Sequence, residues 1–289
     1  MSGSFRDLLT GPAATLLPGA MNALAARIIE DAGFKAIYVT GAGVTTASLG
    51  MPDLGLITAT EIAEQTARIR DVTDLPLVVD ADTGFGNALN TRRTVRSLER
   101  AGASVIQLED QTFPKKCGHF DDKSVIAAGE MVQKLQAAVD ARSSSELLIM
   151  ARTDAAATHG IDAAIERANR YLEAGADISF IEGPRSTDDI ARVAEAVPGP
   201  KLINLVIGGK TPLMSTEELG SLGYSLVLYA NAGLQAAIKA LQEVYGHLFE
   251  HGNIDGVRER LAGFDERQRV IRKDYFDELD RKYSTGETN

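Results

Sequence analysis

A helix end and a β-strand follow one another in the stretch Glu99-Arg100-Ala101-Gly102-Ala103-Ser104-Val105-Ile106-Gln107-Leu108-Glu109. A glycine adopts the left-handed backbone conformation at little cost, so Gly102 is suited to end the helix and lead the chain into the strand. The same device occurs in Glu30-Asp31-Ala32-Gly33 and in Glu173-Ala174-Gly175. Three similar junctions predict one helix–strand unit that is used repeatedly.

Outward from this stretch, short apolar runs recur near residues 14–18, 35–40, 75–80, 104–109, 147–152, 178–182, 201–206 and 224–229. Amphipathic stretches separate them, and the one from Ala128 to Ala141 has apolar side chains at helical spacing. Alternating strands and helices favour a parallel sheet, and eight units predict an α/β fold of the closed (β/α)8 TIM-barrel type over residues 1–250. The alternative is an open doubly wound sheet, but no glycine-rich dinucleotide turn supports it.

Composition narrows the class of protein. The 289 residues carry a formal net charge of −10, and no basic run offers a surface for nucleic acid. A single cysteine cannot form an internal disulfide, as expected in a reducing cytoplasm. The N-terminus lacks the pattern of a signal peptide, and no apolar segment is long enough to cross a bilayer. We therefore expect a cytoplasmic protein with neither a nucleic-acid nor a membrane partner.

The C-terminal region from about residue 254 is rich in charged residues with apolar residues interspersed, which predicts one or two amphipathic helices beyond the eighth unit. We assign residues 251–289 to a C-terminal helical extension. Its apolar stripe needs a partner, and a neighbouring subunit would provide one.

Polar side chains gather where the predicted strands end. They are Thr40, Asp80, Asp82, Glu109, Asp110, Arg152, Asp154, Glu182, Asn204, Tyr229 and Asn231. The carboxyl ends of barrel strands converge on the face that holds the active site. Single polar residues at such positions are often only loop starts, but their recurrence at so many strand ends predicts a functional site.

Two of these residues, Asp80 and Asp82, lie on the same side of a strand because side chains alternate. With Glu109 they form an oxygen cluster suited to Mg²⁺, with Mn²⁺ as the alternative. Three carboxylates gathered without a cation would repel one another. The plainer interpretation is a solvated acidic loop.

Arg152 is suited to clamp a substrate carboxylate, since its planar guanidinium matches two oxygens. Its alternative role is a salt bridge with Asp154 or Glu182. The only cysteine lies in the loop Lys115-Lys116-Cys117-Gly118-His119, where neighbouring cations favour the reactive thiolate. A metal, an arginine clamp and a thiol that serves as general acid together indicate retro-aldol or retro-Claisen chemistry.

Five motifs together resemble the isocitrate lyase/phosphoenolpyruvate mutase superfamily, on its lyase side. They are Asp80-Ala81-Asp82-Thr83-Gly84-Phe85-Gly86, Glu109-Asp110-Gln111, Lys115-Lys116-Cys117-Gly118-His119, Ala151-Arg152-Thr153-Asp154 and Gly208-Gly209-Lys210-Thr211-Pro212. The resemblance runs from about residue 5 to residue 250. It implies a (β/α)8 barrel in a homotetramer whose C-terminal helices are swapped between subunits.

The resemblance also implies roles for single residues. Asp80 and Asp82 are the expected metal ligands, with Glu109 reaching the metal through water. Cys117 is the expected catalytic acid, accompanied by Lys116 and His119. The expected substrate-binding residues are Thr40, Gly41, Ala42, Asp53, Gly118, Arg152, Glu182 and Asn204. Either Tyr38 or a carboxylate network takes the proton of the substrate hydroxyl, and the sequence leaves that choice open.

The activity implied is that of a Mg²⁺-dependent carbon–carbon lyase, which cleaves a 2-hydroxy di- or tricarboxylate of the substituted-malate or methylisocitrate type. Cys117 would protonate a metal-stabilised enolate. Gln235 stands where methylisocitrate lyases have an arginine, and Ile207 where many relatives have glutamate. Losing a cation opposite a carboxylate costs about 2–5 kcal/mol, which favours a substituted malate. Glu182-Gly183-Pro184-Arg185 also resembles the branch of dimethylmalate and petal-death-type lyases.

Three other functions stay open. Mutases of the carboxyphosphonoenolpyruvate and phosphoenolpyruvate type share the metal and the arginine but transfer a phosphoryl group. An oxaloacetate hydrolase or decarboxylase is the second alternative. A non-catalytic binding protein is the third, although the strand-end groups that chemistry requires are all in the sequence.

Overall fold

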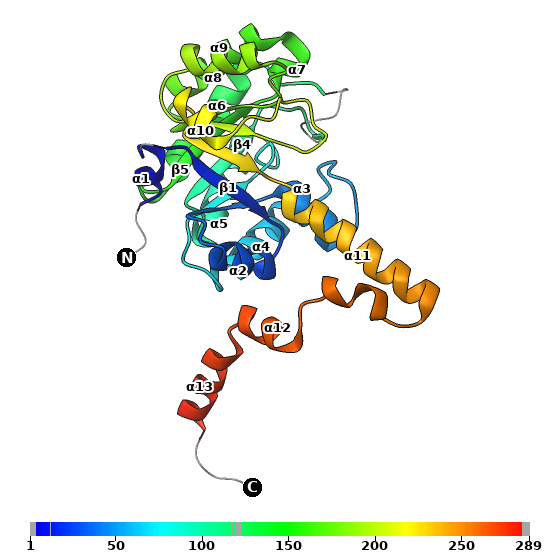
Figure 1. Ribbon diagram of the computed structural model, residues 1–289. Helices are drawn as coiled ribbons and strands as arrows, with labels where there is room; N and C mark the ends of the chain where they lie inside the picture. The colour runs from blue at the N-terminus through cyan, green and yellow to red at the C-terminus, as the bar shows by residue number, and fades with distance from the viewer. Residues whose placement is uncertain (1–3, 12, 117, 119–122, 285–289) are drawn as a thin grey trace. The chain divides into compact units, whose positions relative to one another are not determined.

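The computed structural model describes residues 4–11, 13–116, 118 and 123–284. The chain separates into two compact units, Met1–Leu234 and Gln235–Asn289 (Figure 1). The predicted domain boundary at residue 250 lies within the second unit.

Eight parallel strands close into a barrel in the first unit, and each pairs with its neighbours in chain order. They are β1 (Thr15–Ala20), β2 (Ile37–Val39), β3 (Leu77–Asp80), β4 (Val105–Glu109), β5 (Leu148–Thr153), β6 (Ile178–Ile181), β7 (Lys201–Asn204) and β8 (Leu226–Tyr229). Closure is made by β1 and β8, where Thr15 pairs with Leu226. The predicted (β/α)8 barrel is confirmed, and the open doubly wound sheet is excluded.

One helix of the first unit, α1 (Phe5–Leu9), precedes the strands, and the other helices connect them. The connecting helices are α2 (Ala23–Asp31), α3 (Gly41–Leu49), α4 (Ala59–Arg70), α5 (Ala88–Arg100), α6 (Ala128–Ala141), α7 (Ala155–His159), α8 (Ile161–Glu173), α9 (Thr187–Ala196) and α10 (Thr216–Ser221). The glycines expected to end helices, Gly33, Gly102 and Gly175, have φ values of +87°, +96° and +102°. The left-handed conformation predicted at these junctions is therefore confirmed.

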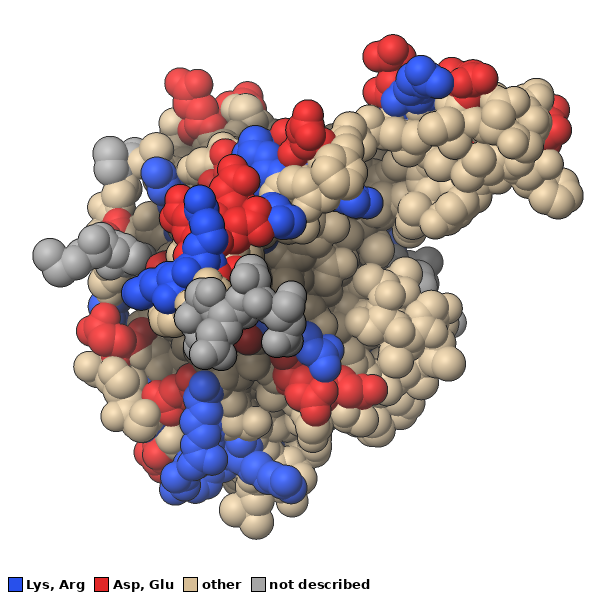
Figure 2. Space-filling model, turned by 90° about the horizontal axis from the view of Figure 1, so that it is seen from below, with Lys and Arg blue, Asp and Glu red and all other residues tan. Residues whose placement is uncertain are grey.

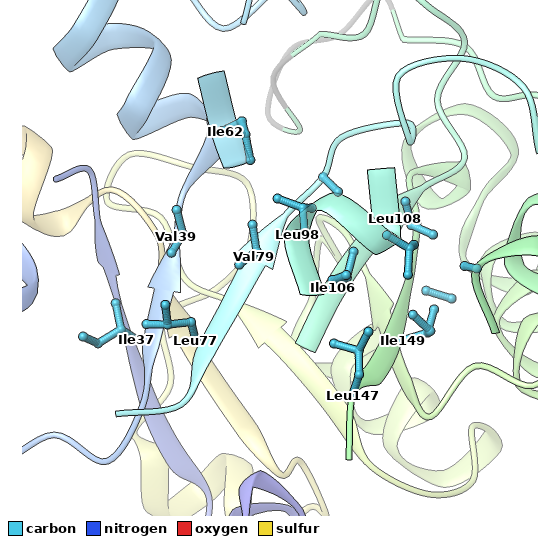
Figure 3. Packing of buried hydrophobic residues seen from close by; sticks show 14 of the residues in the cluster. Ile37, Val39, Ile62, Leu77, Val79, Leu98, Ile106, Leu108, Leu147 and Ile149 are labelled. Atoms are coloured by element: carbon cyan, nitrogen blue, oxygen red, sulfur yellow. The ribbon is translucent and has the colours of Figure 1, made fainter. Parts of the chain in front are cut away.

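Side-chain alternation along the strands separates the core into an outer and an inner layer. Val39, Val79 and Ile106 point out of the barrel toward apolar residues of the helices, such as Ile62 of α4 (Figure 3). The alternate residues of the strands belong to a second cluster inside the barrel, which includes Val78, Met150 and Leu202. Asp80, Arg152 and Asn204 share the parity of this inner set. The packing of the strands therefore directs the polar strand ends toward the barrel axis.

Helix α11 (Ala232–His251) begins at the end of the first unit and continues into the second. The second unit also contains the 3₁₀ helix η1 (Asp255–Arg260), α12 (Phe264–Val270) and α13 (Lys273–Tyr283). The extra C-terminal helices predicted beyond the barrel are present, with one helical segment more than expected, and the assignment of residues 251–289 as a separate extension stays a prediction. Large apolar side chains are exposed on it, among them Phe249 and Phe264. The swapped homotetramer stays a prediction.

Charged side chains of both signs are interspersed on the face that Figure 2 shows. Among the described residues, none of the helices combines the length and apolar character required to span a membrane.

Candidate active site

The polar strand ends do meet at one end of the barrel. Asp80, Glu109, Arg152, Glu182 and Asn204 come from five different strands or the residues directly after them, and each is at most 8% exposed. Glu109 and Arg152 are register partners on β4 and β5. A buried set of charged groups at the carboxyl ends of barrel strands is the expected position of an active site.

Asp80 and Asp82 lie together against the start of α3. The backbone N–H groups of Gly41 and Asp82 donate to the two carboxylate oxygens of Asp80, at 3.3 and 3.2 Å. A Cβ atom at position 41 would lie 3.0 Å from Asp80 Oδ2 and 3.3 Å from Asp82 Oδ1. Gly41 therefore leaves room for both carboxylates, as its predicted place in the site requires.

The loop after β3 has an unusual backbone. Asp82 and Phe85 have φ values of +47° and +59°, a region that residues other than glycine seldom adopt. Thr94 of α5 donates a hydrogen bond to the carbonyl oxygen of Gly84, and Lys134 of α6 donates one to that of Thr83. These contacts stabilise a conformation that turns Asp82 into the site, and such strain is commonly held at functional positions.

Lys115, which was not among the predicted site residues, forms an ion pair with Asp82. Its Nζ lies 2.8 Å from Asp82 Oδ1 and 2.5 Å from Asp53 Oδ1. Burial lowers the pKa of Lys115, but Asp82 and Glu109 outweigh burial and hold it well above its usual value. Burial raises the pKa of Asp82 to about 6 despite this ammonium. Lys115 thus connects the predicted substrate residue Asp53 to a predicted metal ligand.

Arg152 is surrounded by three carboxylates. Its Nε and Nη2 donate to Asp154 at 2.9 and 3.1 Å, while Glu109 and Glu182 lie at 3.3 and 3.6 Å. The Phe180 ring lies 5.3 Å from the guanidinium carbon. The alternative role considered for Arg152, a salt bridge with Asp154 or Glu182, is therefore present, and Asp154 is its main partner.

The cysteine loop reaches this arginine at Gly118. A Cβ atom on Gly118 would lie 2.5 Å from Arg152 Nη2 and 2.8 Å from Glu182 Cγ, closer than packed atoms approach. Lys123 donates both to the carbonyl oxygen of Gly118 and to Asp154 Oδ1. The residue after Cys117 is therefore packed directly on the predicted substrate-binding groups. Cys117 and His119 lie outside the described residues.

Replacing Gly118 with alanine is expected to reduce turnover about a hundredfold, because the added methyl group would displace Arg152 or Glu182. An error of about 1 Å in a positioned group is enough for a loss of this size. Steady-state kinetics would measure it. Gly129→Ala is the control, since Gly129 has only Arg170 Nη2 near its Cβ position, at 3.6 Å. Equal activity of the two variants would contradict the close packing of Gly118.

Negative charge exceeds positive charge in this cluster. Six carboxyl groups lie in it, from Asp53, Asp80, Asp82, Glu109, Asp154 and Glu182, against the cations of Lys115, Lys123 and Arg152. Glu109 Oε1 is buried and has no hydrogen-bond partner among the described residues. Burial and neighbouring carboxylates such as Asp154 raise the pKa of Glu109 well above its usual value, although Arg152 opposes them.

This donor set fits a divalent cation in charge and in chemistry, since it offers hard carboxylate oxygens. Among the described residues, however, no three Asp, Glu, His or Cys side chains are already grouped in metal-binding geometry. The Lys115 ammonium instead lies beside Asp82.

Tyr38, predicted as one of two candidate bases, is buried and donates a hydrogen bond to Gln107 Oε1 at 2.7 Å. Gln107 Nε2 in turn donates to Asp80 Oδ1 at 3.0 Å. Burial and the nearby Asp80 raise the pKa of Tyr38 well above its usual value. Tyr38 therefore stays protonated and orients the Asp80 carboxylate through Gln107.

The other predicted residues are also placed by the structure. Thr40 caps α3 and donates to Asn231 Oδ1 at 3.3 Å, and Ala42 lies in the first turn of that helix. Asn204 Nδ2 lies 3.4 Å from Glu182 Oε2. The backbone N–H and carbonyl of Lys116 bind the Gln111 side chain.

The sequence of residues 5–249 matches the family model of phosphoenolpyruvate phosphomutase. The chain belongs to the isocitrate lyase/phosphoenolpyruvate mutase superfamily. It is 43% identical to 2,3-dimethylmalate lyase of Eubacterium barkeri over 99% of both chains. It is 44% identical to 2-methylisocitrate lyase of Bacillus subtilis, over 88% of this chain and 83% of that one. The predicted enzyme class, a carbon–carbon lyase, is confirmed by the lyases among these relatives.

Solved structures of the superfamily share the fold over nearly the whole chain. Oxaloacetate acetylhydrolase in complex with 3,3-difluorooxalacetate superimposes with a TM-score of 0.91 at 32% identity, covering 97% of this chain and 96% of the other. Phosphonopyruvate hydrolase in complex with oxalate and Mg²⁺ does so with a TM-score of 0.86 at 29% identity, covering 96% and 97%.

This superfamily member also has a supporting hydrogen-bond network around Asp110 that was not predicted from the sequence. Asp110 accepts hydrogen bonds from the Thr153 hydroxyl, the Asp154 backbone N–H and the Tyr171 hydroxyl, at 2.7 to 2.9 Å. Arg167 pairs with the same carboxylate at 3.0 Å. Asp110 thus fixes the position of Thr153 and Asp154 at the end of β5. Its position among the polar strand ends was a signal in the sequence, but its partners were not predictable from it.

Proposed function

We propose that this chain is a divalent-metal-dependent lyase that cleaves a substituted malate, a 2-hydroxy dicarboxylate, into a 2-keto acid and a monocarboxylate. The observation that carries the proposal is the packing of Gly118 on Arg152 and Glu182. Gly118 directly follows the only cysteine in the sequence, and it lies against a buried arginine surrounded by carboxylates.

Arg152 would bind a carboxylate of the substrate. Asp154 holds its Nε and Nη2 in short hydrogen bonds, which fixes the guanidinium plane. The contacts with Glu109 and Glu182 are longer, at 3.3 and 3.6 Å, so a substrate carboxylate can replace them. Gly118 packs directly on Arg152 and Glu182 at this position.

The proposed cleavage removes a proton from the substrate 2-hydroxyl and adds one to C3. A carboxylate of the cluster accepts the proton of the substrate 2-hydroxyl, the C2–C3 bond breaks, and its electron pair passes to C3 as C2 becomes a ketone. The thiol of Cys117 then gives its proton to C3 and is reprotonated for the next cycle. The pKa of Tyr38 is raised, so its hydroxyl stays protonated, and this supports the carboxylate network as the base.

Asp80, Asp82 and Glu109 would hold the metal, which we propose to be Mg²⁺ or Mn²⁺. When bound, it supplies positive charge for the oxygens of the substrate. The excess of carboxylates in the cluster supports this assignment, as does the Mg²⁺ in the phosphonopyruvate hydrolase structure. The role of Cys117 rests on its place directly before Gly118 in the sequence.

The test is a panel of 2,3-dimethylmalate, 2-methylmalate, 2-methylisocitrate and oxaloacetate, with products followed by ¹H NMR. We expect cleavage of a substituted malate to a keto acid, loss of turnover with EDTA and recovery with Mg²⁺. Cys117→Ser should reduce cleavage more than a hundredfold, because a hydroxyl is a far weaker acid than a thiol. Unchanged turnover by this variant would remove the thiol from the mechanism.

The panel also separates the neighbouring substrate classes. Preferred turnover of 2-methylisocitrate would contradict the inference drawn from Gln235. Hydrolysis of oxaloacetate is the second candidate function, favoured by the close match to oxaloacetate acetylhydrolase, and it would yield two acids without a keto acid. ³¹P NMR with phosphonopyruvate would detect the phosphoryl-transfer alternative.

A further inference from the structure

A cavity lies beside the loop after β3. It has a volume of about 580 Å³ and is lined by apolar side chains including Leu56, Ile57, Phe85, Phe113 and Ile126. That size and lining are typical of sites for small organic molecules. The proposed mechanism makes no use of this cavity.

One charged group of the lining, Lys134 of α6, is buried, at 5% exposed. Its Nζ donates a hydrogen bond of 2.8 Å to the carbonyl oxygen of Thr83. An ammonium group has three donors, and within the described part of the chain Lys134 has no other hydrogen bond and no carboxylate within 4 Å. Glu130, one turn earlier on α6, also lines the cavity, but it is exposed to solvent.

The backbone around the cavity adds positive potential. Three helices of at least twelve residues start at it: α4 after Thr58, α5 after Asn87 and α6 after Ala127. The N-terminus of a helix carries a partial positive charge. Thr58 and Asn87 cap their helices with side-chain hydrogen bonds, whereas α6 has no side-chain cap. A buried ammonium that has no ion pair among the described residues and three helix starts thus face one largely apolar volume.

We propose that this cavity binds a small amphipathic anion, a carboxylate with an alkyl or aryl body. The carboxylate accepts the free N–H donors of Lys134, and the apolar body packs against Phe85, Phe113 and Ile126. Burial lowers the pKa of Lys134, and a bound anion offsets that cost by stabilising the charged ammonium. Lys134 also donates to the carbonyl oxygen of Thr83, directly after Asp82, so the ligand and the loop after β3 would contact the same side chain.

Two fluorescent probes with the same ring skeleton test this proposal: anionic 8-anilinonaphthalene-1-sulfonate and neutral N-phenyl-1-naphthylamine. Lys134→Met is expected to raise the Kd of the sulfonate at least tenfold and to change that of the neutral amine less than twofold. The matched control is Lys201→Met. Lys201 is also buried, and its Nζ lies 3.4 Å from the carbonyl oxygen of Gly223, in the turn between α10 and β8.

A second variant reduces the volume of the cavity and leaves the charge of Lys134 unchanged. Ala59→Trp places an indole at the cavity wall and should weaken both probes on the folded chain. Octanoate should displace the sulfonate from the wild-type protein, and octan-1-ol at the same concentration should displace it less. The proposal is overturned if Lys134→Met binds the sulfonate as tightly as Lys201→Met does, or if Ala59→Trp leaves both probes bound.

Discussion

Arg152→Lys is expected to lower kcat/KM about a thousandfold while the barrel stays folded. An ammonium group is a point charge and cannot donate twice to Asp154 in one plane while it also faces Glu109 and Glu182. Two charge-assisted hydrogen bonds are lost, each contributing roughly 1.5–3 kcal/mol. Kinetics with the substrate found in the panel, beside a thermal melt of the variant, would measure the effect.

Arg142→Lys is the matched control for this substitution. Arg142 pairs with Asp177 at 2.9 Å, between the end of α6 and the start of β6, at the opposite end of the barrel from the site. It should lose little activity. A similar kcat/KM for the two variants would show that the guanidinium of Arg152 has no special role.

Lys115→Met is expected to destabilise the fold by about 3–5 kcal/mol and to abolish turnover. Removing one partner of a buried ion pair leaves uncompensated charge in the interior, here on both Asp82 and Asp53. Urea unfolding of the metal-free protein would give the free energy of unfolding. Adding Asp53→Asn to Lys115→Met should restore part of it, because one of the two stranded carboxylates is then neutral.

Lys201→Met separates this effect from the loss of any buried lysine, because the contact of Lys201 is with a carbonyl oxygen. We expect it to cost much less than Lys115→Met. If both variants lose the same stability, or if Asp53→Asn brings no recovery, then Lys115 does not neutralise the two aspartates.

Repeating patterns made the barrel predictable from the sequence. The glycine junctions and apolar runs are local features, and they determine where each helix ends and each strand begins. The residues at the strand ends followed directly, because the topology of a barrel brings all of them to one face. Asp80, Glu109 and Arg152 were found in this way without any knowledge of their contacts.

Which of two adjacent lysines enters the site could not be predicted in the same manner. The Gln111 side chain binds both the N–H and the carbonyl of Lys116, at 3.0 and 2.9 Å, and the Lys115 side chain is the one that is buried. That orientation depends on the path of the loop in space. The same holds for Tyr38, whose hydroxyl is committed to Gln107 on a strand 69 positions later in the chain.

The carboxylates around Arg152 have a consequence for how ligands leave. In the proposed binding mode an incoming carboxylate would replace Glu109 and Glu182 beside Arg152, so these two side chains would compete with the ligand. A dicarboxylate brings two charged groups to this exchange, whereas a monocarboxylate brings one. The fragment with a single carboxylate is therefore readily replaced by the side chains of the protein itself. Cleavage would therefore convert a ligand that displaces these glutamates from Arg152 into one that they displace.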